Sequence, residues 1–394
     1  MAISSRIKNA MENASWIRKM FEEGQRLKKE LGEENVFDLT LGNPLLDPPD
    51  ELRKKMIVLL EHPEPRMHAY MQNAGYPFVR KKVAEFYKKE TGIGFTEDNI
   101  VMTCGAAGGL NVVLKTLLDV GDEVIIFAPY FPEYLFYIEN HCGKVVIVRT
   151  NEDFSLNMVR VEEAINERTK VVLVNSPNNP TGVMYGQYHF QALAEVLKEH
   201  QRKTGKTVYL INDAAYRKIV YDGRKAPYIF PFYNNSIEVT SHSKDLGLAG
   251  ERIGHIAVSP EANDLKSIIN GLIFSNRTLG YVNAPALMQR AVADFQHTSI
   301  NIMEYQKRRD YLFEALCEMG YEMVKPEGAF YLFPRSPEED DIVFVRKLQK
   351  KGLLVTPGIG FGTSGYFRIS YAVPMEVLER AVSIFDEVAR EYGL

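Results

Sequence analysis

This 394-residue chain has the composition of a globular protein, with 45% hydrophobic and 25% charged residues, and its length predicts two domains. No stretch approaches the roughly 18 uninterrupted apolar residues that a membrane-spanning helix needs, so we expect no membrane anchor. The formal net charge of -4, from 47 basic and 51 acidic residues, gives the chain no general attraction to nucleic acid.

From about residue 77 to 260, helix-type segments alternate with short apolar segments, a pattern typical of βα units around a mainly parallel sheet. Helices are expected at residues 77–90, 110–118, 131–140 and 188–200, with a turn of small residues at 105–109. Seven strands are expected at residues 100–103, 123–127, 145–148, 171–174, 208–211, 239–241 and 256–258. Ligands of such sheets bind at the carboxyl ends of the strands, so the turns that follow them are the first candidates for a site.

After about residue 285 the pattern changes to a long helical stretch followed by short strands, which predicts a second, smaller domain. Its strands are expected at residues 321–324, 331–333, 353–355 and 367–370, and its last helix at 374–392. An amphipathic helix expected at 15–31 is placed with this domain. We therefore divide the chain into an N-terminal segment (1–48) that packs with the small domain, a large domain (49–285) and a C-terminal small domain (286–394).

The cysteines and the N-terminus point to the cytoplasm. Cys104, Cys142 and Cys317 are odd in number and widely separated, which fits neither a disulfide framework nor a metal site. The first twenty residues lack the apolar core and cleavage site of a signal peptide. We expect a cytoplasmic protein without a metal.

The segment from Ser241 to Arg252 contains residues suited to an aldehyde that carries a phosphate. A lysine such as Lys244 can form a Schiff base with an aldehyde when its pKa is lowered, and a nearby cation such as Arg252 lowers it. The hydroxyls of Ser241 and Ser243, together with the guanidinium, suit a phosphate. Taken alone, one lysine in such a segment is more often part of a solvated loop.

Three further segments follow expected strands. Asp213 can pair with a protonated pyridine nitrogen, and Tyr216 can reach a phenolic oxygen of the same ring, although an isolated aspartate there is more often a cap or turn residue. Residues 175–182 contain two consecutive asparagines, whose amides lie where a ligand is expected. Residues 105–109 let backbone N–H groups approach an anion, but a tight turn made for packing explains them equally well.

With these residues in view, the sequence resembles the fold type I pyridoxal-phosphate (PLP)-dependent aminotransferases of classes I and II, which include the aspartate, aromatic and alanine aminotransferases. The similarity covers nearly the whole chain. It rests on the motifs SHSKDLGLAGERIG, NNPTG, NDAAY and the C-terminal PGIGFGTSGYFRIS, which follow one another along the chain in the family's order. The resemblance implies an α/β fold, with a large domain on a mainly parallel seven-stranded sheet flanked by helices and a smaller α+β domain formed by both chain ends.

The resemblance also implies roles for the residues around the cofactor, pyridoxal 5'-phosphate. Lys244 forms the Schiff base and then moves the proton between Cα of the substrate and C4′ of the cofactor. Asp213 pairs with the pyridine nitrogen, while Asn179 and Tyr216 hold the phenolic oxygen. The residues implied at the phosphate are Gly105, Ala106, Ala107, Ser241, Ser243 and Arg252.

Four more positions match the family's motifs. Phe131 corresponds to the aromatic residue that stacks on the cofactor ring, although a role in the core is also open for it. Arg368 corresponds to the arginine that binds the substrate α-carboxylate, and Gly42 to the segment that closes over the substrate; Asn179 is also implied at the substrate. Tyr70 corresponds to a tyrosine that reaches the phosphate of the neighbouring subunit, which implies a homodimer with shared active sites.

The implied function is transfer of an amino group from an L-amino acid to a 2-oxo acid, with 2-oxoglutarate and glutamate as one pair, by a ping-pong mechanism. Some similar enzymes selective for dicarboxylates carry a lysine where this chain has Ala107, so aspartate, aromatic and alanine specificity stay open. A PLP-dependent carbon–sulfur β-lyase or decarboxylase uses the same residues and is the nearest alternative. A non-catalytic PLP-binding regulator is disfavoured because the similarity begins near Asp38. A dinucleotide enzyme is disfavoured because the chain lacks a GxGxxG motif that comes after a strand and is followed by an acidic residue.

Overall fold

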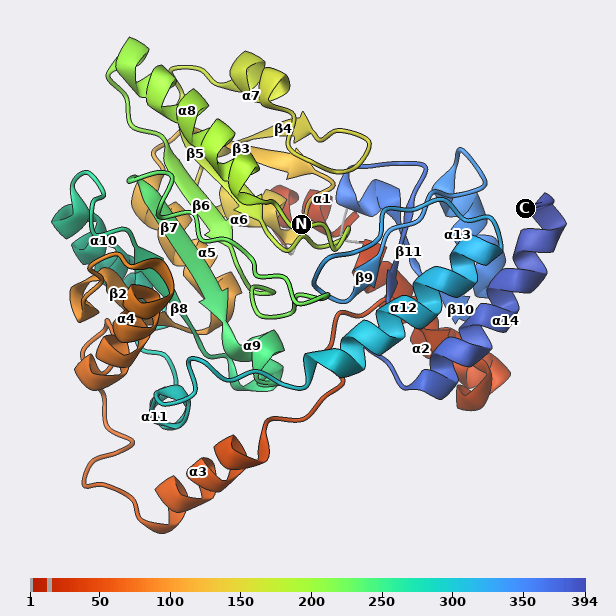
Figure 1. The fold of residues 1–394 in the computed structure, drawn as a ribbon, viewed down its shortest axis with the longest axis horizontal. Coiled ribbons are helices and arrows are strands. Elements are labelled where there is room, and N and C mark those ends of the chain that lie inside the picture. Colours follow the sequence, from red (N-terminus) through yellow and green to blue (C-terminus); the bar gives the residue numbers. More distant parts are fainter. Residues whose placement is uncertain (1–2, 13–15) are drawn as a thin grey trace.

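The computed structural model describes residues 3–12 and 16–394, and its largest element is a seven-stranded sheet (Figure 1). The strand order is β2-β8-β7-β6-β5-β3-β4. All neighbouring strands are parallel except the two pairs that β8 makes, with β2 and with β7. The strands are β2 (Ile100–Thr103), β3 (Glu123–Ala128), β4 (Lys144–Arg149), β5 (Thr169–Asn175), β6 (Tyr209–Asp213), β7 (Ser236–Ser241) and β8 (Gly254–Val258). The expected mainly parallel, seven-stranded sheet is confirmed.

Helices cover both faces of this sheet, which explains why its strands are continuous apolar runs in the sequence. Alternate residues of β3 enter different cores: Ile125 and Phe127 pack in one, and Val124 and Ile126 in the other. The first core includes residues of α4 (Pro77–Thr91) and α8 (Gln187–Thr204). The second includes residues of α5 (Gly105–Leu117), α6 (Glu133–Asn140) and α10 (Leu265–Thr278).

A third core joins the C-terminal helices to two small sheets. One sheet is antiparallel with the order β11-β12-β9, and the other pairs β1 with β10 in parallel. The elements here are β1 (Phe37–Asp38), β9 (Tyr331–Leu332), β10 (Leu353–Leu354), β11 (Thr356–Pro357), β12 (Phe367–Ser370), α12 (Ile302–Glu318), α13 (Asp341–Lys350) and α14 (Met375–Tyr392). In the described residues, the remaining α-helices are α1 (Ser5–Glu12), α2 (Trp16–Leu31), α3 (Asp50–Glu61), α7 (Met158–Ala164), α9 (His242–Asp245) and α11 (Ala286–Val292).

The N-terminal segment contacts these C-terminal elements. Strand β1 pairs with β10, the Ser370 N–H donates to the Leu39 carbonyl, and Leu39 is buried in the third core. The helix expected at 15–31 is present as α2, while Ser15 itself lies outside the described residues. The division of the chain at residues 48/49 and 285/286 stays a prediction.

Two sequence-based expectations were wrong. Residues 105–109 form the first turns of α5 rather than a separate turn, because small residues let this helix lie close to the sheet: a Cβ on Gly109 would stand 2.6 Å from the Val239 side chain. Residues 321–324 form no strand. Tyr321 buries its aromatic ring in the third core, while its hydroxyl donates to the Phe385 carbonyl, and this buried ring produced a strand-like pattern without a partner strand.

Across the described part of the chain, no helix combines the length and the apolar character needed to cross a bilayer.

Candidate active site

A cavity of about 260 Å³ lies at the carboxyl ends of β5, β6 and β7, beside the N-terminus of α5. Residues from both ends of the chain line it together with residues of the central sheet. Twelve of the residues predicted from the sequence are among those lining it: Gly42, Ala106, Ala107, Phe131, Asn179, Asp213, Tyr216, Ser241, Ser243, Lys244, Arg252 and Arg368. The structure therefore brings together side chains that are up to 326 positions apart, from Gly42 to Arg368 (368 − 42).

Lys244 presents its amine to this cavity from α9. The Nζ donates a hydrogen bond to the Gly42 carbonyl at 2.6 Å. Burial lowers the pKa of Lys244 to about 8, with further contributions from Arg368 and Arg252, against the opposing charge of Asp213. The neutral form of the amine, which attacks a carbonyl carbon, is therefore far more populated near neutral pH than for an ordinary lysine, whose pKa is about 10.4.

Asp213 ends β6 and holds a carboxylate deep in the cavity. Burial raises its pKa, while a hydrogen bond from Tyr134 Oη to Oδ2, at 2.7 Å, opposes this. Its carbonyl accepts from Asn175 Nδ2 at 2.9 Å, which fixes the end of β6 against the end of β5. A buried carboxylate held in this way is suited to a cationic ring nitrogen.

Tyr216 meets a residue of the C-terminal part of the chain. Its hydroxyl lies 2.7 Å from that of Tyr331, and burial raises its pKa well above the ordinary value. A Cβ on Gly42 would stand 1.8 Å from Tyr331 Oη, so a larger residue at position 42 cannot fit without movement. The conformation thus depends on a glycine in the N-terminal segment.

Arg368 is a buried cation that no carboxylate in the described residues neutralises. It is 1% exposed, and burial lowers its pKa. Its Nη1 donates to Asn179 Oδ1 at 2.8 Å and its Nη2 to the Thr40 carbonyl, whereas its Nε has no hydrogen-bond partner. An unpaired buried guanidinium at a cavity is suited to a carboxylate ligand, which can accept two parallel hydrogen bonds from it.

Another part of the cavity lining has the features of an anion site. Ala106 and Ala107 are in the first turn of the 13-residue helix α5, where free N–H groups and the helix dipole attract negative charge. A Cβ on Gly105 would stand 2.8 Å from Arg252 Nη2, so the glycine lets the guanidinium approach this turn. Ser241 and Ser243 add hydroxyls at the same cavity, and the whole set suits a phosphate.

Two predicted positions behave differently. Phe131 lines the cavity with its ring 5.5 Å from that of Tyr134 in an edge-on arrangement, so stacking on a cofactor stays a prediction. Tyr70 lies between α3 and α4, is 90% exposed, and is not among the residues that line the cavity. Its expected role concerns a second subunit and also stays a prediction.

The structure adds residues that the sequence reasoning did not assign to the site. Tyr134, Tyr137, Asn175 and Tyr331 line the cavity. Asn175 begins the segment 175–182, which the sequence had already indicated, and Tyr134 stands three residues after Phe131. Their closeness in sequence to predicted site residues could have indicated both. Tyr331 belongs to the C-terminal part of the chain, and nothing in its local sequence indicates that it reaches Tyr216.

These residues fit pyridoxal phosphate. The cavity combines an amine of lowered pKa, a buried carboxylate 31 residues before it, an anion site at a helix N-terminus and an unpaired guanidinium for a substrate carboxylate. Each group matches one functional part of the cofactor or of an amino-acid substrate. The fold and the site therefore define the class of PLP-dependent enzymes on an α/β scaffold.

Comparisons with known proteins agree. A family model described as Aminotransferase class I and II matches residues 34–385. A probable aspartate aminotransferase of Methanocaldococcus jannaschii is 32% identical over 98% of this chain and 99% of its own length. Aromatic-amino-acid aminotransferase 2 of Thermococcus litoralis is 30% identical, with 100% of both chains covered. The crystal structure of an amino transferase from Eubacterium rectale is similar over 100% of both chains, with a TM-score of 0.96 and 34% identity.

The chain belongs to the class I and II aminotransferases. It is a PLP-dependent transaminase, as the sequence predicted, and the comparisons do not favour the β-lyase or decarboxylase alternative.

Proposed function

We propose that this aminotransferase uses Lys244 both to hold the cofactor covalently and to move the proton during transfer of the amino group. The observation that carries the proposal is the Lys244 amine, whose pKa is lowered to about 8 in a cavity that also contains Asp213 and Arg368. When bound, pyridoxal phosphate supplies an electron sink for the pair of electrons left at the substrate α-carbon.

The surrounding residues orient the reacting atoms. Arg368 binds the substrate α-carboxylate, and its hydrogen bond to Asn179 fixes the direction of the guanidinium. Lys244 Nζ would take the proton from the substrate Cα as a base and deliver it to C4′ of the cofactor as an acid. Asp213 keeps the ring nitrogen protonated, and Tyr216 donates to the phenolic oxygen. Ser241, Ser243, Arg252 and the N–H groups of α5 anchor the phosphate.

For the substrates, we infer that glutamate and 2-oxoglutarate form one pair and that the second amino acid is of the aspartate, aromatic or alanine type. The lining of the cavity favours an aromatic side chain. Within the described residues that line it, the cations are Lys244, Arg252 and Arg368, each with a role already proposed, while Phe131 and three tyrosines other than Tyr216 offer apolar surface. Ala107 adds no charge.

We further infer a homodimer with shared sites. Tyr70 is 90% exposed, and the neighbouring α3 exposes Ile57, Val58 and Leu60, an apolar surface that a second subunit would cover. The cytoplasmic location expected from the sequence stays a prediction.

A substrate panel tests the function. Purified enzyme with PLP and 2-oxoglutarate should form glutamate from L-phenylalanine or L-tyrosine with a higher kcat/KM than from L-aspartate. A higher kcat/KM for aspartate would contradict the inferred aromatic preference. With a sulfur amino acid such as L-cysteine added to the panel, net release of pyruvate and ammonia without glutamate would contradict transamination itself.

A further inference from the structure

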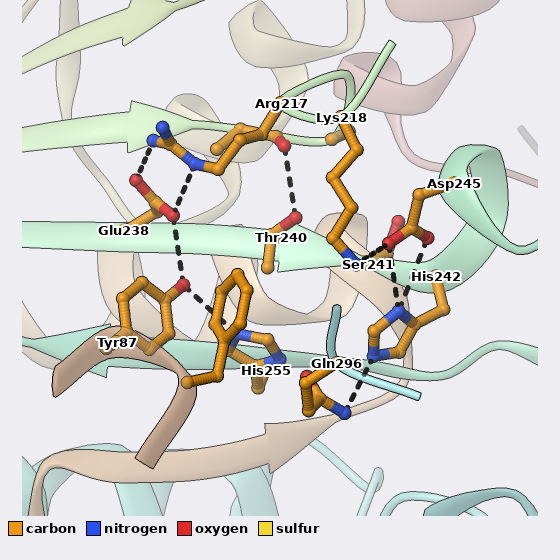
Figure 2. A pocket seen from close by; sticks show the side chains of 13 residues that line it. Tyr87, Arg217, Lys218, Glu238, Thr240, Ser241, His242, Asp245, His255 and Gln296 are labelled. Carbon is orange, nitrogen blue, oxygen red and sulfur yellow. Dashed lines mark hydrogen bonds and ion pairs between the residues drawn. The ribbon is translucent and has the colours of Figure 1, made fainter. Parts of the chain in front are cut away.

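A group of buried charged and polar side chains lies behind the turn that carries Lys244 (Figure 2). It surrounds a separate cavity of about 20 Å³, which has room for about one water molecule. Lys244 lines the cofactor cavity, whereas its neighbour Asp245 lines the smaller one. Apart from Ser241, which is proposed to bind the phosphate, the residues that line the smaller cavity have no role in the proposed mechanism.

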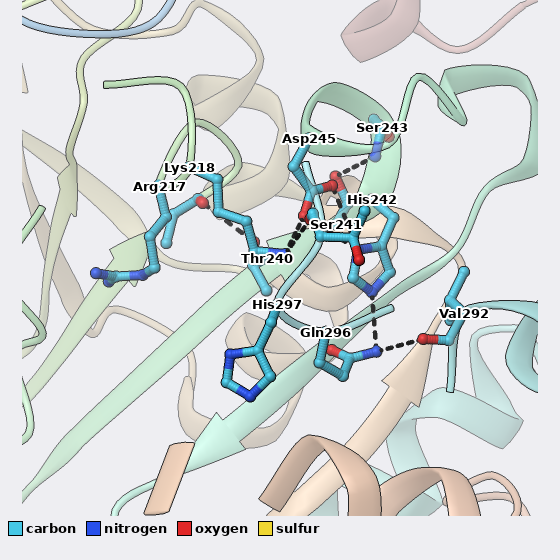
Figure 3. Close-up of polar contacts among 12 residues, drawn as sticks. Arg217, Lys218, Thr240, Ser241, His242, Ser243, Asp245, Val292, Gln296 and His297 are labelled. Atoms are coloured by element: carbon cyan, nitrogen blue, oxygen red, sulfur yellow. Dashed lines mark hydrogen bonds and ion pairs between the residues drawn. The ribbon is translucent and has the colours of Figure 1, made fainter. Parts of the chain in front are cut away.

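Asp245 is the centre of the group. Lys218 Nζ donates to its Oδ2 at 2.7 Å, and the Nδ1 of His242 lies 3.2 Å from the same oxygen and 3.3 Å from Oδ1 (Figure 3). Burial alone would raise the pKa of Asp245, but Lys218 and His242 outweigh it and hold the pKa well below its usual range. The carboxylate is therefore ionised and shared by two donors.

Gln296 fixes the direction in which His242 donates. Its Nε2 donates to the Val292 carbonyl at 2.8 Å, so this atom is the amide nitrogen, and it lies 3.5 Å from His242 Nε2 (Figure 3). The histidine Nε2 then accepts and its Nδ1 carries the hydrogen that points to Asp245. Asp245 also accepts, through its backbone carbonyl, from the Ile300 N–H at 2.7 Å.

Lys218 connects this group to a second part of the active site. It lies two residues after Tyr216, in the turn that follows β6. Besides Asp245, its Nζ donates to the Thr298 carbonyl at 3.1 Å. The Lys218–Asp245 ion pair therefore joins the turn that carries Tyr216 to α9, the short helix that carries Lys244. Lys244 Nζ lies 5.9 Å from the centre of the Tyr216 ring.

We propose that Lys218, Asp245 and His242 form a buried clamp that holds Lys244 at its working distance from Tyr216, so that all three are positioning residues for the proton transfer. This rests on the roles proposed above for Lys244 and Tyr216. The clamp acts through the backbone of two short turns, and a small displacement of a reacting group costs large factors in rate.

The other charges around the small cavity are satisfied separately. Arg217 pairs with Glu238, whose Oε1 also accepts from Tyr87 Oη at 2.9 Å (Figure 2). His255 is neutral, since burial lowers its pKa to about 3. The Phe86 ring lies 5.6 Å from Lys218 Nζ. Asp245 is thus the carboxylate that Lys218 contacts directly.

The test compares variants that break the clamp with variants that preserve it. Lys218→Met removes the cation, and Lys218→Arg keeps it. His242→Phe removes the donor to Asp245, and His242→Asn keeps an N–H in nearly the same place as Nδ1. In the holoenzyme we expect Lys218→Met and His242→Phe to lower kcat by about 10- to 100-fold with KM within threefold, and both conservative variants to remain within about fivefold of wild type.

The pH at which the absorbance of the bound cofactor changes supplies a second readout. In Lys218→Met this midpoint should rise, because the carboxylate of Asp245 loses its cation and then favours protonation of the nitrogen that joins Lys244 to the cofactor. In Lys218→Arg the midpoint should stay unchanged. Glu238→Gln is the matched control, since it breaks a buried pair beside the same cavity that has no contact with Asp245. It should lower Tm but leave the midpoint unchanged.

The clamp is refuted if Lys218→Met changes only Tm, or if Lys218→Arg loses as much kcat as Lys218→Met. An equal shift of the midpoint in Glu238→Gln would also refute it. A failure of the proposed function looks different: Lys244→Ala would then retain turnover, whatever the clamp variants do.

Discussion

Replacing Arg368 with lysine should weaken recognition of the substrate carboxylate by a predictable factor. The buried guanidinium can offer two parallel hydrogen bonds to a carboxylate, whereas an ammonium offers one in that geometry. A hydrogen bond to a charged group contributes about 1.5–3 kcal/mol. Loss of one such bond corresponds to a decrease of about 10- to 150-fold in kcat/KM, at about 1.4 kcal/mol per tenfold.

The assay compares an L-amino acid with the amine that lacks its carboxylate. In Arg368→Lys, kcat/KM for the amino acid should fall by that factor, while kcat/KM for the amine should change less than threefold. The amine corrects for general damage, which is a real concern because Arg368 also bonds to Asn179 and to the Thr40 carbonyl. If both substrates lose the same factor, or if the amino acid loses none, Arg368 does not bind the carboxylate.

Three further predictions concern the cofactor. Tyr134→Phe removes the hydrogen bond that lowers the pKa of Asp213; the pKa should rise, so the acid limb of the kcat profile should move to higher pH and kcat should fall about tenfold, and an unchanged limb would contradict this. The rate of PLP binding to apoenzyme should rise with pH and level off above about pH 8, because the neutral Lys244 amine reacts; levelling off only near pH 10.5 would show an unshifted amine. Tyr70→Phe should weaken PLP binding about tenfold. A mixed dimer of one Tyr70→Phe subunit and one Lys244→Ala subunit should regain one site of wild-type affinity, because that site combines an intact Lys244 with an intact Tyr70. No recovery in the mixed dimer would place Tyr70 outside the shared site.

The sheet and the polar residues that follow its strands could be predicted from the sequence. Strands buried on both faces are short apolar runs, and a site at their carboxyl ends follows from the geometry of parallel sheets. Ser241 is the last residue of β7, as the strand pattern indicated, whereas β6 runs two residues beyond the expected end at residue 211 and ends at Asp213. The local sequence was sufficient because each residue lies at the end of its strand.

The contacts between distant segments could not be predicted in this way. The Tyr216–Tyr331 contact joins residues 115 positions apart, and the Lys218–Asp245 pair joins two turns whose sequences give no sign of each other. The start of α5 was missed because glycines disfavour helices, and here close packing on the sheet outweighs that preference. Tertiary packing decides such cases.

Reduction of the holoenzyme with borohydride, followed by peptide mapping, tests the central claim most directly. The account predicts that the reduced cofactor is found on the peptide containing Lys244, and that Lys244→Ala shows neither the label nor transamination. Label on a different lysine, or full turnover by Lys244→Ala, would contradict it.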